Sequence, residues 1–170
     1  MQNIISNATP LIYLAKADQL SLLYEMFETI FIPDAVYREV VIHGKNKEET
    51  DAFRVEGAVK DGWIVVKKVK KICDIELSIH PGEVEVLSLA REMAIKVVLM
   101  DDTKARIAAE LAGLRPKGTL WLLLNAVKGK ILDFDRFLIV LEDIVKSGFY
   151  LKEEVFLKAV HQAKTLYEKA

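Results

Sequence analysis

Short apolar runs in this chain alternate with longer segments in which apolar residues recur every three or four positions. The short runs predict buried strands at 3–6, 29–32, 63–66 and 97–100. The last run, Val97-Val98-Leu99-Met100, is continuously apolar and ends at two acidic residues. A run of this kind is typical of a parallel sheet that helices cover on both faces.

The longer segments predict amphipathic helices between the strands and through the C-terminal third of the chain. We expect the first helix to begin at Thr9-Pro10, with Thr9 as its N-cap, and a short helix capped by Asp34 to follow the second strand. Further helices are expected at 47–60, 81–95, 103–111, 118–128, 133–145 and 151–169. This order predicts an α/β fold, a three-layer α/β/α sandwich around a short, mainly parallel central sheet.

The chain has 170 residues and shows no linker and no internal repeat. We therefore expect a single domain over 1–170, with 131–170 as a C-terminal helical extension. The apolar face of the last helix, which includes Val155 and Phe156, is most simply core packing, and the alternative is a partner or dimer face.

The charge balance and the cysteine content exclude some classes of protein. The 24 Lys and Arg residues nearly balance the 25 Asp and Glu residues, which argues against a protein that coats nucleic acid by bulk electrostatics. A single cysteine excludes a disulfide framework. We see no signal peptide and no apolar run near the about 20 residues that a bilayer requires, so we expect a cytoplasmic protein that makes no membrane contact.

Candidate chemistry lies where the predicted strands end, because ligands bind at this edge of open α/β sheets. Asn7 follows the first strand, Asp101 and Asp102 follow the fourth, Glu83 lies in the first turn of the preceding helix, and Glu39 lies on the helix after the second strand. Carboxylates in one cleft raise one another's pKa unless a cation neutralises them. Oxygen ligands favour Mg²⁺ or Mn²⁺, which support phosphodiester hydrolysis.

Each of these residues also has an ordinary structural interpretation. Asn7 is a common turn residue, and Glu39 could be a solvent-exposed residue of a surface helix. Glu83 could interact favourably with the positive N-terminal end of a helix dipole. Asp101 and Asp102 could cap the next helix. Two adjacent acids at the end of a strand are less routine, so this pair gives the strongest indication of a site.

Other features give weaker indications. The basic run at 67–71 could follow an RNA backbone, although such a run is more often a solvated strand edge. Lys104 and Arg106 are better placed to hold phosphates near the acidic residues. The three histidines have no metal-ligand spacing, and no Gly-rich phosphate loop is present.

Several segments resemble PIN-domain proteins and occur in that family's order between residue 4 and about residue 130. They are Ser6–Lys16, Ile32–Val40, Gly82–Ala90, Leu99–Arg106 and Gly118–Leu120. The resemblance is closest to a prokaryotic branch of PIN-like proteins predicted to bind nucleic acid. It implies an α/β/α sandwich and a Mg²⁺- or Mn²⁺-dependent ribonuclease site of three or four carboxylates.

The resemblance also assigns roles to residues. It implies catalytic positions at Glu39, Glu83 and either Asp101 or Asp102, of which we favour Asp102 slightly, and a metal-binding set of Asn7, Glu83, Asp101 and Asp102. Thr119 takes a small hydroxyl position that can hold water or phosphate, and it joins Lys104 and Arg106 as the expected substrate contacts. Asn7 stands where PIN domains usually carry Asp, so it offers an oxygen but no charge.

The expected function is that of a metal-dependent endoribonuclease acting on single-stranded RNA. Many PIN-domain proteins are toxins of toxin–antitoxin pairs and form dimers, so an antitoxin protein and a second copy of the chain are the expected partners. A catalytically weakened module that binds RNA or a partner is the alternative, and Asn7 is its best sequence evidence. A phosphohydrolase of small phosphate esters is a third reading.

Overall fold

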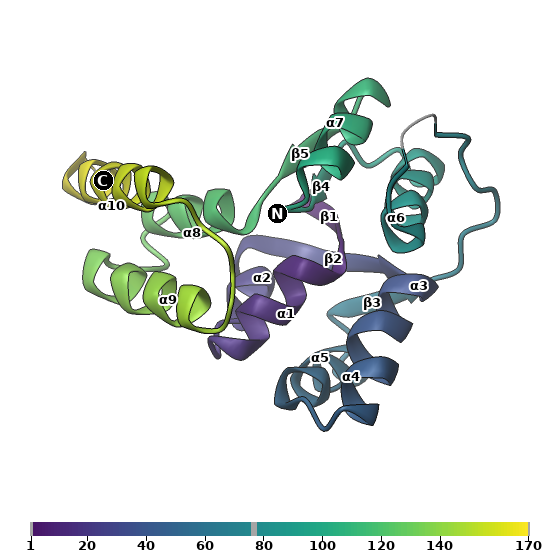
Figure 1. Ribbon diagram of the computed structural model, residues 1–170, viewed down its shortest axis with the longest axis horizontal. Helices are drawn as coiled ribbons and strands as arrows, with labels where there is room; N and C mark the ends of the chain where they lie inside the picture. The colour runs from purple at the N-terminus through teal and green to yellow at the C-terminus, as the bar shows by residue number, and fades with distance from the viewer. Residues whose placement is uncertain (1, 76–77, 170) are drawn as a thin grey trace.

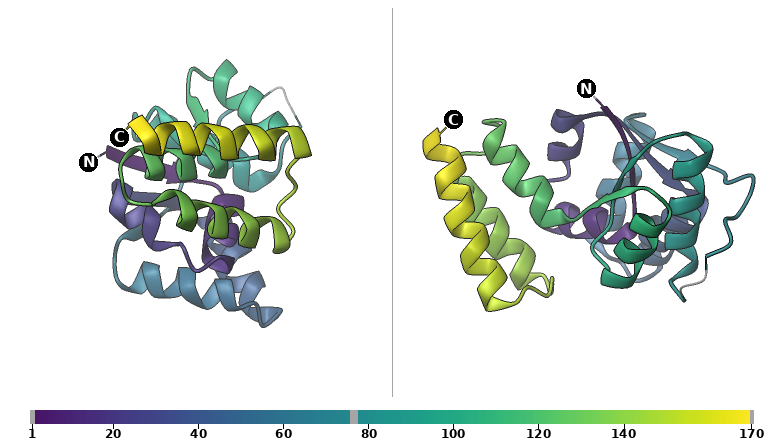
Figure 2. Two further views of the ribbon diagram at one scale, coloured as in Figure 1. Left: turned by 90° about the vertical axis from the view of Figure 1, so that its left-hand side faces the viewer. Right: turned by 90° about the horizontal axis from the view of Figure 1, so that it is seen from above.

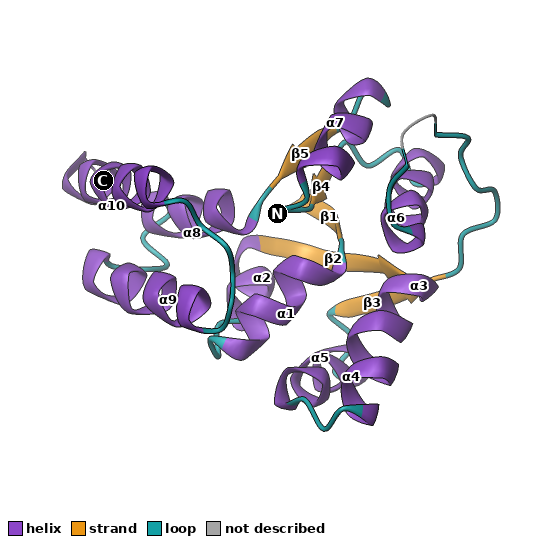
Figure 3. Ribbon diagram, viewed as in Figure 1, coloured by secondary structure: helices purple, strands orange, loops and turns teal. Residues whose placement is uncertain are grey.

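The computed structural model describes residues 2–75 and 78–169, and in this part of the chain five strands form one parallel sheet (Figures 1 and 3). The strand order is β3-β2-β1-β4-β5, and every neighbouring pair is parallel. The strands are β1 Gln2–Ser6, β2 Phe27–Pro33, β3 Ile64–Lys67, β4 Val97–Leu99 and β5 Arg115–Lys117. All five strands therefore point their carboxyl ends at the same edge.

Helices cover both faces of the sheet, which confirms the predicted α/β sandwich. Because crossovers between parallel strands are right-handed, helices that follow β1 and β2 lie on one face and those that follow β3 and β4 lie on the other. The helices before β4 are α1 Ala8–Lys16, α2 Ser21–Met26, α3 Asp34–Tyr37, the π-helix η1 Arg38–His43, α4 Gly44–Asn46, α5 Thr50–Lys60 and α6 Pro81–Glu92. Those after β4 are α7 Thr103–Leu111, α8 Thr119–Lys128, α9 Phe134–Lys146 and α10 Glu153–Lys169.

The last three helices pack together at one end of the molecule (Figure 2). Helix α10 contacts α8 and α9, and α9 also contacts α1. The buried face of α9 carries Phe137, Val140, Leu141 and Ile144. The division of the chain into a domain and a helical extension at 131–170 stays a prediction. No helix in the described ranges is both long enough and apolar enough to cross a membrane.

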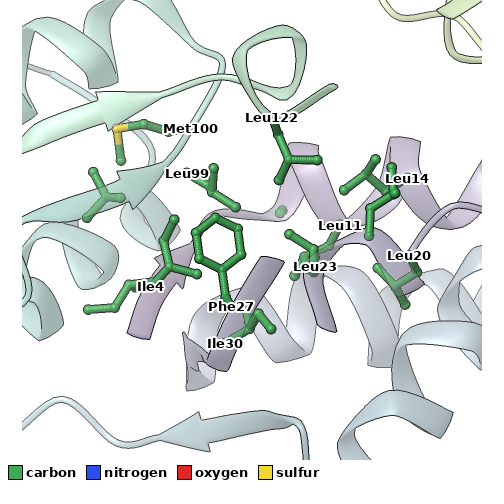
Figure 4. Packing of buried hydrophobic residues seen from close by; sticks show 14 of the residues in the cluster. Ile4, Leu11, Leu14, Leu20, Leu23, Phe27, Ile30, Leu99, Met100 and Leu122 are labelled. Carbon is green, nitrogen blue, oxygen red and sulfur yellow. The ribbon is translucent and has the colours of Figure 1, made fainter. Parts of the chain in front are cut away.

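Apolar side chains from the sheet and from its covering helices form a continuous core (Figure 4). Ile4, Ile30 and Leu99 on the strands are fully buried, as are Leu11 on α1 and Leu122 on α8. Burial of each such side chain contributes about 1.5–3 kcal/mol to stability. The core therefore holds the carboxyl ends of β1 and β4 in fixed positions for the polar residues that follow them.

Three local predictions were wrong. Helix α1 begins at Ala8 and is capped by Asn7, not by Thr9, because Asn7 Oδ1 accepts a hydrogen bond from the Ala8 backbone nitrogen at 2.7 Å. Asp34 is the first residue of α3 and makes no side-chain cap. Strand β5 was not predicted, because Arg115-Pro116-Lys117 carries no apolar run.

Candidate active site

The candidate site lies at the carboxyl edge of the sheet, between the ends of β1 and β4 and the first turns of α6 and α7. The Asn7 backbone nitrogen donates a hydrogen bond to the Leu99 carbonyl oxygen at 2.8 Å, which ties the end of β1 to the end of β4. Asp101 and Asp102 follow directly, and Glu83 approaches from the first turn of α6. Chain segments far apart in the sequence thus meet at this edge.

Asn7 contacts Glu83 directly. Asn7 is 5% exposed, and its Nδ2 lies 3.4 Å from Glu83 Oε1, to which it donates a hydrogen bond. An aspartate at this position could not donate this bond and would repel the carboxylate. The amide therefore lowers the electrostatic cost of bringing β1 against α6.

Glu83 is a buried carboxylate, 8% exposed, that also takes part in a capping box. Its Oε2 accepts a hydrogen bond from the His80 backbone nitrogen at 2.9 Å. Burial raises the pKa of Glu83, and repulsion from Asp102 and Glu39 raises it further, whereas the hydrogen bond from His80 and the charge of that residue oppose the rise. Glu39 and Asp102 are therefore close enough to Glu83 for their charges to affect its ionisation.

Glu39 reaches the start of α6 from the π-helix η1. Its Oε2 lies 3.9 Å from His80 Nδ1. A Cβ atom built on Gly82 would lie 3.4 Å from both of these atoms, which is ordinary van der Waals contact, so the two side chains lie over the first turn of α6. His80 lies at the candidate site although its spacing to other histidines does not indicate a metal ligand. Its position three residues before Glu83 is the spacing of a capping box and could have indicated it.

The two adjacent aspartates face different partners. Asp101 Oδ1 accepts a hydrogen bond from the Thr119 backbone nitrogen at 2.8 Å, and Asp101 Oδ2 accepts one from Thr119 Oγ1 at 2.7 Å. Asp102 is exposed and caps α7, because its Oδ1 accepts a hydrogen bond from the Ala105 backbone nitrogen at 2.9 Å. Asp102 therefore belongs with Glu83, whereas Asp101 joins β4 to the start of α8.

The surroundings of Asp101 are tightly packed. Burial raises the pKa of Asp101, and the hydrogen bonds from Thr119 and the charge of Arg106 act in the opposite direction. A Cβ atom on Gly118 would lie 2.7 Å from Asp101 Oδ1 and 3.1 Å from Arg106 Nη1. Only glycine lets the chain pass this close to the carboxylate.

The predicted substrate contacts differ in their access to solvent. Lys104 is exposed on α7, and Arg106 is half-buried beside Gly118. Thr119 is 1% exposed and its hydroxyl is bonded to Asp101. This geometry makes Thr119 a partner of Asp101, and its contact with a water or phosphate stays a prediction.

Comparison with known proteins agrees with this arrangement. A family model described as a PIN domain matches residues 3–165. The chain belongs to the PIN-domain family. No curated protein and no solved structure matches the chain. The PIN domain is a nuclease-type fold, and PIN domains generally use divalent metal ions.

The donor atoms of this PIN domain fit such an ion chemically. Among residues 2–75 and 78–169, no three His, Cys, Asp or Glu side chains converge closely enough to ligate a metal as they stand. Asp102 caps α7 with one oxygen and keeps the other for an ion, whereas both Glu83 oxygens accept hydrogen bonds, Oε2 from the His80 backbone and Oε1 from Asn7 Nδ2. Each carboxylate oxygen has two lone pairs, so the Glu83 oxygens can still accept a further partner. Hard oxygen donors without a thiolate suit Mg²⁺ or Mn²⁺.

Proposed function

We propose that this PIN domain is a Mg²⁺- or Mn²⁺-dependent endoribonuclease that hydrolyses phosphodiester bonds in single-stranded RNA. The observation that carries this proposal is the buried carboxylate of Glu83, whose pKa is raised by burial and by repulsion from Asp102 and Glu39. Carboxylates crowded in this way are costly by themselves and are stabilised by a bound cation. The fold places them at the sheet edge where α/β proteins bind ligands.

Each residue has a distinct role in this proposal. Glu83 and Asp102 hold the ion, and Glu39 orients the attacking water or assists a second ion. A divalent ion bound here supplies Lewis-acid activation of water and neutralises charge on the phosphate. Asn7 holds Glu83 in place through its amide, and a metal contact by its oxygen would share that atom with the Ala8 cap.

Residues around this set position it and contact the RNA. Asp101, bonded twice to Thr119, fixes the junction between β4 and α7 and so orients the Asp102 backbone. Lys104 and Arg106 follow Asp102 on α7 and contact phosphates of the bound strand. The negative charge of RNA requires local cations of this kind, because the formal charge of the whole chain is −1.

Cleavage of labelled single-stranded RNA by the purified protein tests the proposal. We expect cleavage in Mn²⁺ or Mg²⁺, none in EDTA, and a loss of about 10²-fold or more in Glu83→Gln and Asp102→Asn. Glu110→Gln is the matched control, because Glu110 is an exposed glutamate on α7. Unchanged cleavage in both site variants would refute the assignment.

The hydrogen bond from Asn7 to Glu83 favours one alternative, a catalytically weakened module that binds RNA or a partner protein. An amide in place of a carboxylate lowers the charge available to hold a cation. RNA binding that is equal in Mn²⁺ and EDTA, without cleavage by the wild-type protein, would support this alternative. Cleavage that depends on metal and on Glu83 would exclude it.

We also propose that the protein is the cytoplasmic toxin of a toxin–antitoxin pair and acts as a homodimer. The support is its family membership together with the proposed nuclease site. Expression of the wild-type chain in a bacterial host should arrest growth, whereas Glu83→Gln should not. Light scattering of the purified protein measures its oligomeric state, and a monomeric mass would exclude the homodimer.

A further inference from the structure

A groove of about 890 Å³ opens beside the carboxylates of the site. Its walls come from α1, the N-terminal parts of α7 and α8, the segment at 148–152 that joins α9 to α10, and α10 itself. In Figure 1 this connection leaves α9 beside α1 and passes the start of α8 on its way to α10. Asp101 and Asp102 line one part of the groove, so a molecule bound in it would reach the proposed cleavage site.

Aromatic side chains line the same groove as Asp101 and Asp102. Tyr13 and Phe149 pack edge to face with their ring centroids 5.0 Å apart, which anchors the connecting segment to α1. The next residue, Tyr150, is 81% exposed, and Trp121 on α8 is half-buried. The structure thus presents the Tyr150 ring to solvent on a segment that the Tyr13–Phe149 pair holds in place, and the half-buried Trp121 ring on α8 lines the same groove.

Positive charges accompany these rings. Lys117 Nζ lies 5.4 Å from the centroid of the Trp121 ring, and Arg106 and Lys152 line the groove. Sites for single-stranded nucleic acid combine aromatic platforms, on which unpaired bases stack, with cations that follow the phosphates. The groove has both features, and its volume lies within the usual range of ligand sites.

We propose that this groove is a base-stacking subsite, in which Trp121 and Tyr150 stack on unpaired bases next to the phosphate at the carboxylates. Lys117 and Lys152 contact the phosphates that link those bases. The inference deepens the proposed function and rests on it for the placement of the scissile phosphate. Such a subsite would select single strands, because bases inside a duplex do not offer their faces to a ring.

Fluorescence of Trp121 gives a direct test, since the chain has two tryptophans and the other, Trp63, lies beside Tyr24 at the opposite edge of the sheet. In Trp63→Phe, Trp121 is the only indole. We would titrate this variant in EDTA with a single-stranded RNA decamer and with an abasic strand of equal length. We expect the decamer to quench the fluorescence and the abasic strand to leave it nearly unchanged.

Tyr150→Ala should weaken binding of the decamer about tenfold, a loss typical of one stacked base. Tyr24→Ala is the matched control, because it removes an exposed tyrosine, 58% exposed, from the far edge of the sheet and should leave binding unchanged. Fluorescence anisotropy of a labelled decamer measures the affinities of Tyr150→Ala and Tyr24→Ala in the protein that retains Trp63. Thermal melting of each variant establishes that it folds.

The outcomes separate this inference from the proposed nuclease activity, because binding is measured without metal. Equal quenching by the abasic strand, or wild-type affinity in Tyr150→Ala, would overturn the stacking subsite even if the protein cleaves RNA. Base-dependent quenching that Tyr150→Ala weakens would support the subsite even if no cleavage occurs. In an active enzyme, Tyr150→Ala should raise KM much more than it lowers kcat.

Discussion

At the scale of single residues, Asn7 sets how much negative charge the site carries. Asn7→Asp replaces the hydrogen bond to Glu83 by repulsion and adds a carboxylate, while aspartate still caps α1 as well as asparagine does. We expect this variant to bind Mn²⁺ more tightly, to cleave RNA faster and to melt at a lower temperature in EDTA. Titration calorimetry and thermal melting measure these effects.

Asn7→Ala is the companion variant. It removes both the cap of α1 and the contact with Glu83, so we expect a loss of about 1 kcal/mol in stability and no gain in Mn²⁺ affinity. An Asn7→Asp variant that binds Mn²⁺ no better than the wild type would show that residue 7 does not face the ion.

Single residues also show how far the sequence could predict the site. The strand and helix patterns were enough to expect Glu39, Glu83 and Asp102 at one edge. They could not separate Asp102 from Asp101, because adjacent residues after a strand point in different directions and Thr119, which bonds to Asp101, lies 18 residues away in the chain. His80 has no ligand spacing, and its approach to Glu39 depends on how η1 packs against the start of α6.

At the scale of elements, the junction between β5 and α8 depends on Gly118. Gly118→Ala would push a methyl group to within 2.7 Å of Asp101 Oδ1, so we expect a loss of about 1–3 kcal/mol in stability and weaker cleavage. Gly57→Ala is the control, because Gly57 lies in α5 with no atom within 4 Å of the new Cβ atom. It should stabilise the protein by about 0.8–1 kcal/mol through helix propensity.

Urea denaturation measures both glycine variants under the same conditions. Cleavage should fall in Gly118→Ala and stay unchanged in Gly57→Ala, since only the first disturbs Asp101. Equal stability of Gly118→Ala and the wild type would mean that Asp101 can move away from Thr119 at little cost, and its positioning role would then be wrong.

The elements that sequence patterns missed have physical causes. Strand β5 contains Pro116, which cannot donate to a ladder and is tolerated at a sheet edge. Besides its pairing with β4, two backbone bonds tie β5 to the residues that flank β4, since the Arg115 nitrogen donates to the Lys96 carbonyl and the Met100 nitrogen donates to the Lys117 carbonyl. Apolar periodicity cannot indicate such a strand. The apolar pattern also does not distinguish a π-helix such as η1 from an α-helix, because both kinds of helix bury one apolar stripe.

At the scale of the whole molecule, the net charge is near zero, yet individual carboxylates differ in their pKa. The pKa of Glu56 is lowered and that of Glu83 is raised. Glu56 on α5 lies 2.9 Å from Lys45 Nζ and 3.1 Å from Lys60 Nζ. The hydrogen bonds from these two ammonium groups lower the pKa of Glu56. A lowered pKa gives stability that is present above the ordinary value of 4.5 and is lost as the pH falls below it.

Glu56→Gln should therefore be less stable than the wild type at pH 7, and the difference should close at acid pH. Added salt should also reduce the difference, because the ion pairs are near the surface. The urea midpoints of Glu56→Gln and of the wild type, determined at several pH values, measure this difference in stability. A difference that does not change with pH would mean that Glu56 stabilises α5 by packing and not by charge.

Glu83 should show the opposite dependence. Its pKa is raised in the folded protein, so in EDTA the wild type loses stability as the pH rises above the ordinary glutamate value of 4.5. Glu83→Gln removes the charge, and its single amide oxygen keeps the bond from the His80 backbone while the longer bond of 3.4 Å from Asn7 Nδ2 is lost. The variant should therefore be more stable than the wild type at pH 7, and the two should converge at acid pH.

Mn²⁺ completes this comparison. A cation that binds the ionised carboxylates stabilises the folded state, and this binding requires the carboxylate of Glu83. Mn²⁺ should therefore raise the melting temperature of the wild type and leave that of Glu83→Gln unchanged. Because proton and cation compete for the same oxygens, the shift should grow as the pH rises. Equal shifts in both proteins would place the ion elsewhere, and no shift in either would favour the metal-independent binding module.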